Sequence, residues 1–170
     1  MDRLMSIHRI QDVKRWHTYP VTRGQNLAEH SWSVAILAAY LADWTPSAEL
    51  LMAALVHDVA ETELGDIPST AKWEFGNVQI SPTEEIERRL GVFETIHALP
   101  EGSTRTLWWA DKLDMLVHSV TEIRLGNAPM EVVFDRVWMK LETQKDIPPR
   151  AMALMNYLAE RVDYPRSIPS

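Results

Sequence analysis

The hydrophobic residues of the chain recur mostly three or four positions apart, which is the spacing of a buried helix face. Residues 2–16 show this spacing from Leu4 to Trp16, and the pattern predicts a helix there. No segment shows a convincing alternation of apolar and polar residues, so no strand is expected. Further helices are predicted over residues 26–44, 46–65, 81–99, 103–125, 129–144 and 148–162.

Capping and breaking residues set the predicted boundaries of these helices. Asn26, with Glu29 three residues later, resembles a capping box. Thr45–Pro46 and Ser81–Pro82 each pair a capping hydroxyl with a first-turn proline. Residues 65–80 read as irregular. We find no internal repeat and no linker, so residues 1–170 are expected to form one all-α domain of roughly six to seven helices.

The composition narrows the class of protein. Of the 170 residues, 46% are hydrophobic, yet no apolar run approaches the roughly 20 residues of a membrane helix. The N-terminus carries charges throughout and does not resemble a secretory signal. The chain has no cysteine, which excludes disulfides and thiolate metal ligands. A soluble cytoplasmic protein with no membrane partner is therefore expected.

The net charge of −7 argues against binding of long nucleic acid, which requires a basic face. A small phosphorylated ligand is not excluded, because it requires only a few local cations or a metal ion.

Imidazoles and carboxylates interrupt three otherwise apolar helices. His57–Asp58 follows the apolar run "LLMAALV", His30 lies in "AEHSWSVAILAAYL", and Asp111 begins "ADKLDMLV". Burying a charge costs several kcal/mol unless the charge is paired or bound to a metal. Two imidazoles and two carboxylates on packed helices can form a transition-metal site. Spacing alone is a weak signal, because the residues are far apart in the sequence.

The residues His30, His57–Asp58 and Asp111 resemble the H…HD…D signature of the HD-domain metal-dependent phosphohydrolases. Further stretches resemble the bacterial 5'-deoxynucleotidases and the compact phage dATP triphosphohydrolases over roughly residues 1–126. These stretches are "RW" at 15–16, "NLAEHSWSVA" at 26–35, "HDVAETELGDIPSTAKW" at 57–73 and "ADKLDM" at 111–116.

This resemblance implies a metal cofactor and a reaction. His30, His57, Asp58 and Asp111 would hold one divalent ion (Co, Mn, Zn, Ni or Fe), with Mg²⁺ as a candidate second ion on the phosphates. The substrate would be a small deoxynucleotide. A deoxynucleoside monophosphate would lose phosphate, and a triphosphate such as dATP would lose triphosphate.

The resemblance also assigns acid–base and substrate-binding roles. Glu61 and Asp66 would be catalytic, although a solvated helix-end glutamate and a turn aspartate are the structural alternatives. The substrate-binding candidates are Arg15, Trp16, Lys72 and Lys112. Arg15 would bind phosphate, and Trp16 would exclude a 2'-hydroxyl unless it is an ordinary core residue. The two lysines would contact phosphate unless they face solvent.

Other readings stay open at this stage. The chain could be a non-catalytic HD module that senses nucleotide, or a hydrolase of a cyclic nucleotide or an alarmone. Arg15–Trp16 argues against the hydrolase alternative, and intact ligands with Glu61 and Asp66 argue against the sensor. His118, seven residues after Asp111, is expected in the core or beside the site. The family commonly self-associates, so a homo-oligomer is expected.

Overall fold

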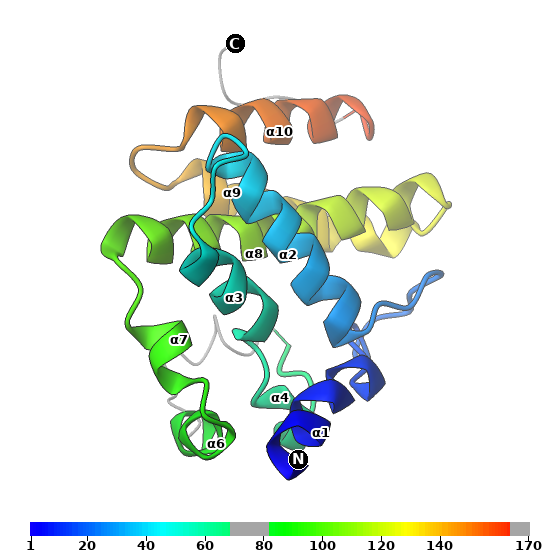
Figure 1. The fold of residues 1–170 in the computed structure, drawn as a ribbon. Coiled ribbons are helices and arrows are strands. Elements are labelled where there is room, and N and C mark those ends of the chain that lie inside the picture. The colour runs from blue at the N-terminus through cyan, green and yellow to red at the C-terminus, as the bar shows by residue number, and fades with distance from the viewer. Residues whose placement is uncertain (69–81, 164–170) are drawn as a thin grey trace.

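The computed structural model describes residues 1–68 and 82–163, and every regular element within these ranges is a helix (Figure 1). The all-α prediction is therefore confirmed. The elements are α1 (Asp2–His8), η1 (Arg9–Asp12), α2 (Leu27–Leu41), α3 (Ala48–Val56), α4 (Glu61–Leu64), α6 (Thr83–Leu90), α7 (Phe93–His97), α8 (Glu101–Arg124), η2 (Ala128–Met130), α9 (Glu131–Glu142) and α10 (Pro149–Glu160). Among the described helices, none has the length and apolar character needed to cross a membrane.

The long helix α8 lies across the middle of the molecule, with α2 crossing it and α9 and α10 packed along it (Figure 1). Its apolar side chains join those of α9 and α10 in the largest core cluster. Burial of one large apolar side chain contributes about 1.5–3 kcal/mol, so this cluster fixes α8 firmly. The fully buried members include Trp109, Leu113, Leu116, Phe134, Trp138 and Met155.

Small residues let α3 approach α2 closely. Ala35 and Ala38 of α2 pack with Ala54 of α3 in a second buried cluster, which also contains Ala110 of α8. Short side chains allow a small distance between helix axes. The end of α3 is thereby brought beside the first half of α2, where His30 lies.

The first predicted helix ends early. The 2–16 prediction is wrong beyond Asp12, where η1 stops and the chain becomes extended. The reason is that the Arg15 N–H donates to the Gln25 carbonyl (2.9 Å) instead of to a preceding turn. This pairing sets the segment around Arg15 against the segment that enters α2. The capping box of Asn26 is confirmed.

The predicted helix over 46–65 is interrupted. α3 begins one residue after Ser47, whose hydroxyl accepts the Leu50 N–H (3.2 Å), so the assignment of Thr45 as the N-cap was wrong. α3 ends at Val56, and the chain winds on through tighter turns, with the Glu61 N–H donating to the Asp58 carbonyl (2.9 Å). Such three-residue hydrogen bonds are typical of helix ends.

The predicted helix over 81–99 is also divided. Gly91 adopts a left-handed conformation (φ 78°) and separates α6 from α7. Glycine reaches this conformation without strain, and it commonly ends helices for that reason. The predicted cap Ser81 lies outside the described residues.

One buried carboxylate, Glu122 of α8, anchors the loop before α2. It accepts hydrogen bonds from the backbone N–H groups of Thr22 (2.6 Å) and Arg23 (2.7 Å), and from the Asn127 side chain (2.7 Å). Burial raises the pKa of Glu122, but these hydrogen bonds outweigh it and lower the pKa below its ordinary value of 4.5. Glu122 therefore fixes the loop that leads to Gln25.

We predict that Glu122→Ala lowers the free energy of unfolding by roughly 3 kcal/mol at pH 7, because two backbone N–H groups and the Asn127 side chain lose a charged acceptor. The folded state has the lower pKa, so this stabilisation is present above pH 4.5 and is lost as the pH falls below it. Urea unfolding of both proteins at pH 7 and at acid pH measures the difference. Glu85→Ala, at an exposed position of α6, is the control. If wild type and Glu122→Ala differed in free energy of unfolding by the same amount at both pH values, the role of the carboxylate would be contradicted.

Candidate functional site

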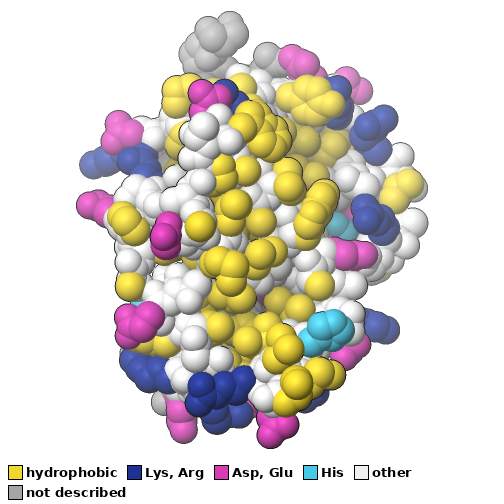
Figure 2. Space-filling model, in the orientation of Figure 1, with side chains coloured by type: hydrophobic (Ala, Val, Ile, Leu, Met, Phe, Trp, Pro, Cys, Tyr) yellow, Lys and Arg dark blue, Asp and Glu magenta, His cyan; other side chains and the backbone are white. Residues whose placement is uncertain are grey.

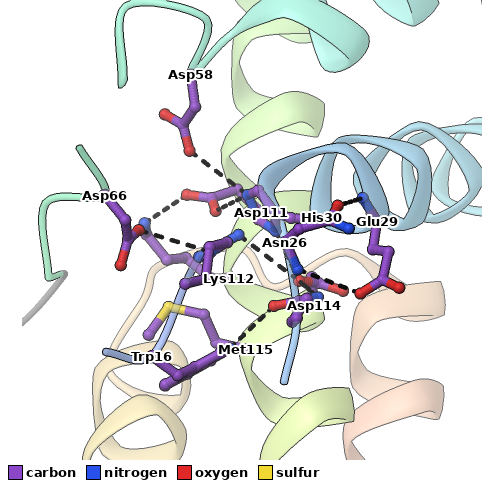
Figure 3. A network of polar contacts seen from close by, with 12 residues as sticks. Trp16, Asn26, Glu29, His30, Asp58, Asp66, Asp111, Lys112, Asp114 and Met115 are labelled. Carbon is purple, nitrogen blue, oxygen red and sulfur yellow. Dashed lines mark hydrogen bonds and ion pairs between the residues drawn. The ribbon is translucent and has the colours of Figure 1, made fainter. Parts of the chain in front are cut away.

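His30 of α2 is completely buried and lies among three carboxylates (Figure 3). Its Nδ1 donates to Asp114 Oδ2 (2.6 Å), while its Nε2 lies 3.5 Å from Asp58 Oδ2 and 3.4 Å from Asp111 Oδ1. Burial and the Arg15 charge lower the pKa of His30, but the three carboxylates outweigh them and raise that pKa to about 10. The cluster therefore strongly favours a positive charge at this place.

His57 lies immediately beyond α3, and the end of that helix sets its orientation. The Ala54 carbonyl belongs to the last turn, where carbonyl groups have no helical N–H partner. The His57 Nδ1 donates to it (2.9 Å). His57 Nε2 consequently points away from the helix and lies 3.3 Å from Asp58 Oδ2.

These side chains form a set of donors that could hold a metal ion. One ligand atom from each of His30, His57 and Asp58 lies within 4.8 Å of the others. Both imidazole Nε2 atoms are buried without a hydrogen-bond partner in the described part of the chain. Nitrogen and carboxylate donors together suit transition ions such as Zn²⁺, Mn²⁺, Fe²⁺, Co²⁺ or Ni²⁺. The donor set therefore fits the metal expected from the sequence.

Asp111 of α8 borders this set from the other side. Burial raises its pKa, but the neighbouring Lys112 and His30 outweigh burial and hold the pKa well below the ordinary value. Lys112 Nζ donates to Asp111 Oδ2 (2.5 Å), so the lysine is engaged with the cluster and does not simply face solvent. The other candidate lysine, Lys72, lies outside the described residues.

Arg15 provides a cationic group next to the carboxylates. Its Nε lies 3.7 Å from Asp66 Oδ1 and its Nη1 lies 4.0 Å from Asp114 Oδ2. Both nitrogens are buried and make no hydrogen bond within the described ranges. The guanidinium therefore has donors available for an anion such as phosphate.

Glu61 and Asp66 lie on either side of one tight turn. Glu61 begins α4, is 4% exposed, and accepts the Ile67 N–H through Oε1 (3.3 Å). Asp66 Oδ2 lies 3.4 Å from His17 Nδ1. Both carboxylates line one recess with about 810 Å³ of empty space. The solvated helix-end alternative for Glu61 does not describe this buried side chain.

Trp16 forms one wall of a second recess. Its backbone is left-handed (φ 62°), an uncommon state for a bulky residue. The indole Nε1 donates to Gln25 Oε1 (2.9 Å), and the ring stacks on His118 with a centroid distance of 4.8 Å and an interplanar angle of 8°. Trp16 is thus a buried core residue, and it also lines this recess.

Arg15 and Asp66 also line that recess. α9 also lines this recess, through Val133, Arg136 and Val137, for which no role was predicted. Val133 and Val137 have the spacing of ordinary core residues, and Arg136 is an exposed arginine of α9, so no sequence signal distinguished the three.

Asp114 was also missed as a site residue. It lies three positions after Asp111 on the buried side of α8, and this spacing places both carboxylates on one helix face. Burial raises its pKa, but the hydrogen bond with His30 and the Arg15 charge lower it overall, so Asp114 is a carboxylate.

Comparison with known proteins supports a family assignment. Residues 7–109 match the sequence model described as HD domain. A dATP triphosphohydrolase of Salmonella phage PMBT28 is 37% identical over 76 residues, which cover 38% of this chain and 39% of that protein. The aligned part thus spans about two fifths of the length of this phage relative.

Two solved structures share the fold. A protein from Pyrococcus horikoshii OT3 superposes with a TM-score of 0.77 at 21% identity, covering 94% of this chain and 98% of the other. The cyanophage S-2L HD phosphohydrolase, bound to dA and one catalytic Zn²⁺ ion, superposes with a TM-score of 0.68 at 19% identity, covering 94% and 95% of the two chains. The sequence match extends over more than half of this chain, so the chain belongs to the HD domain family.

Proposed function

We propose that this protein is a metal-dependent phosphohydrolase of 5'-deoxynucleotides that acts in nucleotide-pool metabolism in the cytoplasm. One observation carries the proposal. The cation site around His30 and His57 adjoins the buried, hydrogen-bond-free donors of Arg15, which form an anion site. Hydrolysis of a phosphate ester requires these two kinds of group side by side.

His30, His57, Asp58 and Asp111 would hold the metal ion. A divalent ion in such a site supplies Lewis acidity to a phosphoryl oxygen and lowers the pKa of a bound water. Asp114 and the Ala54 carbonyl hold the two imidazoles with Nε2 directed to the cluster, and such outer hydrogen bonds strengthen metal ligation.

The neighbouring groups would bind the nucleotide. Arg15 and Lys72 would contact the phosphate, and Lys112 would contact a longer phosphate chain. The recess beside Trp16 and α9 receives the sugar and base, because apolar walls with a few polar groups are typical of ligand pockets. The Trp16 ring leaves no room for a 2'-hydroxyl.

Glu61 and Asp66 would transfer protons. A water oxygen attacks the α-phosphorus while its proton passes to a carboxylate, and the P–O5' bond breaks as the 5'-oxygen receives a proton. A deoxynucleoside triphosphate then yields deoxynucleoside and triphosphate, and a monophosphate yields deoxynucleoside and phosphate. The phage relatives named dATP triphosphohydrolase favour the triphosphate.

The protein is also expected to associate with a second copy. Hydrophobic side chains gather over the face formed by α2 and α3 (Figure 2). Trp32 and Ile36 of α2 and Met52 and Leu55 of α3 are 64%, 41%, 51% and 41% exposed, respectively. Exposed apolar patches mark interaction surfaces. Sedimentation velocity measures the association, and a monomer at micromolar concentration would contradict it.

The experiment that tests the function is incubation with Co²⁺ or Mn²⁺ and a panel of deoxynucleotides and ribonucleotides, followed by identification of phosphate, pyrophosphate or triphosphate. We expect triphosphate from dATP and a preference for dATP over ATP that declines in Trp16→Ala. One unpaired buried hydroxyl accounts for about a 5- to 200-fold preference. Nucleotide binding without any product would indicate a non-catalytic sensor. Turnover of cyclic nucleotides or alarmones alone would indicate the alternative hydrolase.

We predict that His57→Ala and Asp58→Ala abolish activity and most metal binding, because a four-ligand site that loses one ligand holds its ion poorly. Metal binding is measured by competition with a chromophoric chelator after EDTA treatment and re-addition of the ion. His8→Ala, which changes an exposed histidine of α1, is the matched control. Full activity of either site variant after re-addition would remove these residues from the ligand set.

We predict that Glu61→Gln retains metal and substrate binding but loses roughly 10²–10⁴ in kcat, the usual contribution of a general acid or base. The amide keeps an oxygen for the Ile67 N–H, so the turn is preserved. Single-turnover kinetics with dATP measures the loss, with Glu63→Gln as the neighbouring control. If folded Glu61→Gln turned over at the wild-type rate, another group would have to carry out the proton transfer.

A further inference from the structure

A continuous chain of hydrogen bonds joins the Trp16 wall to the candidate metal ligand His30. The Trp16 indole donates to Gln25 Oε1 (2.9 Å), and Gln25 Nε2 donates to Asp114 Oδ2 (3.1 Å). The same Asp114 oxygen accepts from His30 Nδ1 (2.6 Å). Within this series of hydrogen bonds, Gln25 is the residue that contacts both the indole and the carboxylate.

The direction of every hydrogen bond in the chain follows from its first donor. An indole N–H can only donate, so the Gln25 oxygen must face Trp16 and the Gln25 NH₂ group must face Asp114. The Asp114 carboxylate accepts from both neighbours, which requires a proton on His30 Nδ1. The other ring nitrogen, Nε2, then faces Asp58 and Asp111 and would be the atom that ligates a metal ion.

The backbone holds Gln25 rigidly in this position. Its carbonyl accepts the Arg15 N–H (2.9 Å), and it directly precedes Asn26, the N-cap of α2. Glu122 fixes the preceding residues through the backbone of Thr22 and Arg23. A displacement of the Gln25 amide would therefore affect both the indole and the carboxylate, because both are hydrogen-bonded to it.

We propose that Gln25 is a positioning residue that couples the nucleotide-facing indole of Trp16 to the metal-facing imidazole of His30. The sugar-facing role of Trp16 rests on the proposed function, whereas the hydrogen-bond chain does not. Loss of Gln25 lets the indole tilt and leaves Asp114 with one donor fewer. Metal affinity and discrimination between deoxyribose and ribose consequently decline together, although Gln25 belongs neither to the donor set nor to the lining of the recess beside Trp16.

Three variants interrupt the chain at different points. Gln25→Met keeps the length of the side chain but removes both hydrogen bonds. Gln25→Asn keeps the amide but is too short to reach both partners. Trp16→Phe keeps an aromatic ring against His118 but removes the indole N–H together with part of the ring. Matched controls are Gln11→Met, at an exposed position, and Trp44→Phe, since Trp44 is 61% exposed and also has a left-handed backbone (φ 60°).

Two measurements are made on each protein: Co²⁺ affinity by competition with a chromophoric chelator, without nucleotide, and the ratio of kcat/KM for dATP over ATP. Outer hydrogen bonds to metal ligands typically change affinity about 10- to 100-fold. Gln25 is one bond farther out, so we expect roughly a 3- to 10-fold loss of Co²⁺ affinity in all three variants. The controls retain wild-type affinity. The double variant Trp16→Phe/Gln25→Met loses no more Co²⁺ affinity than the single variant with the larger loss, because both substitutions interrupt the same series of hydrogen bonds.

Several outcomes overturn the proposal. Wild-type Co²⁺ affinity in folded Gln25→Met and Gln25→Asn does so, as does an additive double variant, or a loss of affinity in Gln25→Met that Trp16→Phe does not share. Failure of the proposed function is distinguishable: if affinity declines as expected but no deoxynucleotide is hydrolysed, the coupling stands and the substrate assignment fails. If dATP is hydrolysed while affinity and sugar ratio stay unchanged, the coupling fails alone.

Discussion

A completely buried imidazole surrounded by three carboxylates is the constraint on which the rest of this molecule depends. His30 contacts Asp58, Asp111 and Asp114, which come from the end of α3 and from one face of α8. Buried charges are unfavourable unless they compensate one another. The helices must therefore bring the three carboxylates to the imidazole, and the small residues between α2 and α3 allow that approach.

The sequence was sufficient to predict the parts of this arrangement that are local. Helical spacing identified α2, α8, α9 and α10 within a few residues, and the Asn26–Glu29 capping box fixed the start of α2. His57–Asp58 was recognisable as an ionisable pair at the end of an apolar run, and the resemblance to the HD-domain family joined it to His30 and Asp111. Their expected gathering agrees with the distances around His30.

Contacts between distant segments could not be predicted in the same way. The pairing of Arg15 with Gln25 ended the first helix before Trp16, against the local apolar pattern. Asp114 was visible in the sequence, but its bond to His30 spans 84 positions. The α9 wall depends on how α9 packs against α8. Tertiary packing overrides local preference at each of these places.

The short segment between α3 and α4 has a consequence for how the protein would release its ion. His57, Asp58 and Glu61 lie within five consecutive residues, held by tight turns and by the buried Val59 and Ala60, whereas His30 and Asp111 belong to long helices. A local opening of this segment would withdraw two candidate metal ligands and the proposed acid–base group at once. An ion bound to both halves would oppose that opening by mass action. Metal binding and ordering of the segment would then be coupled in a single equilibrium. When the ion is scarce, this segment would therefore open before the core unfolds.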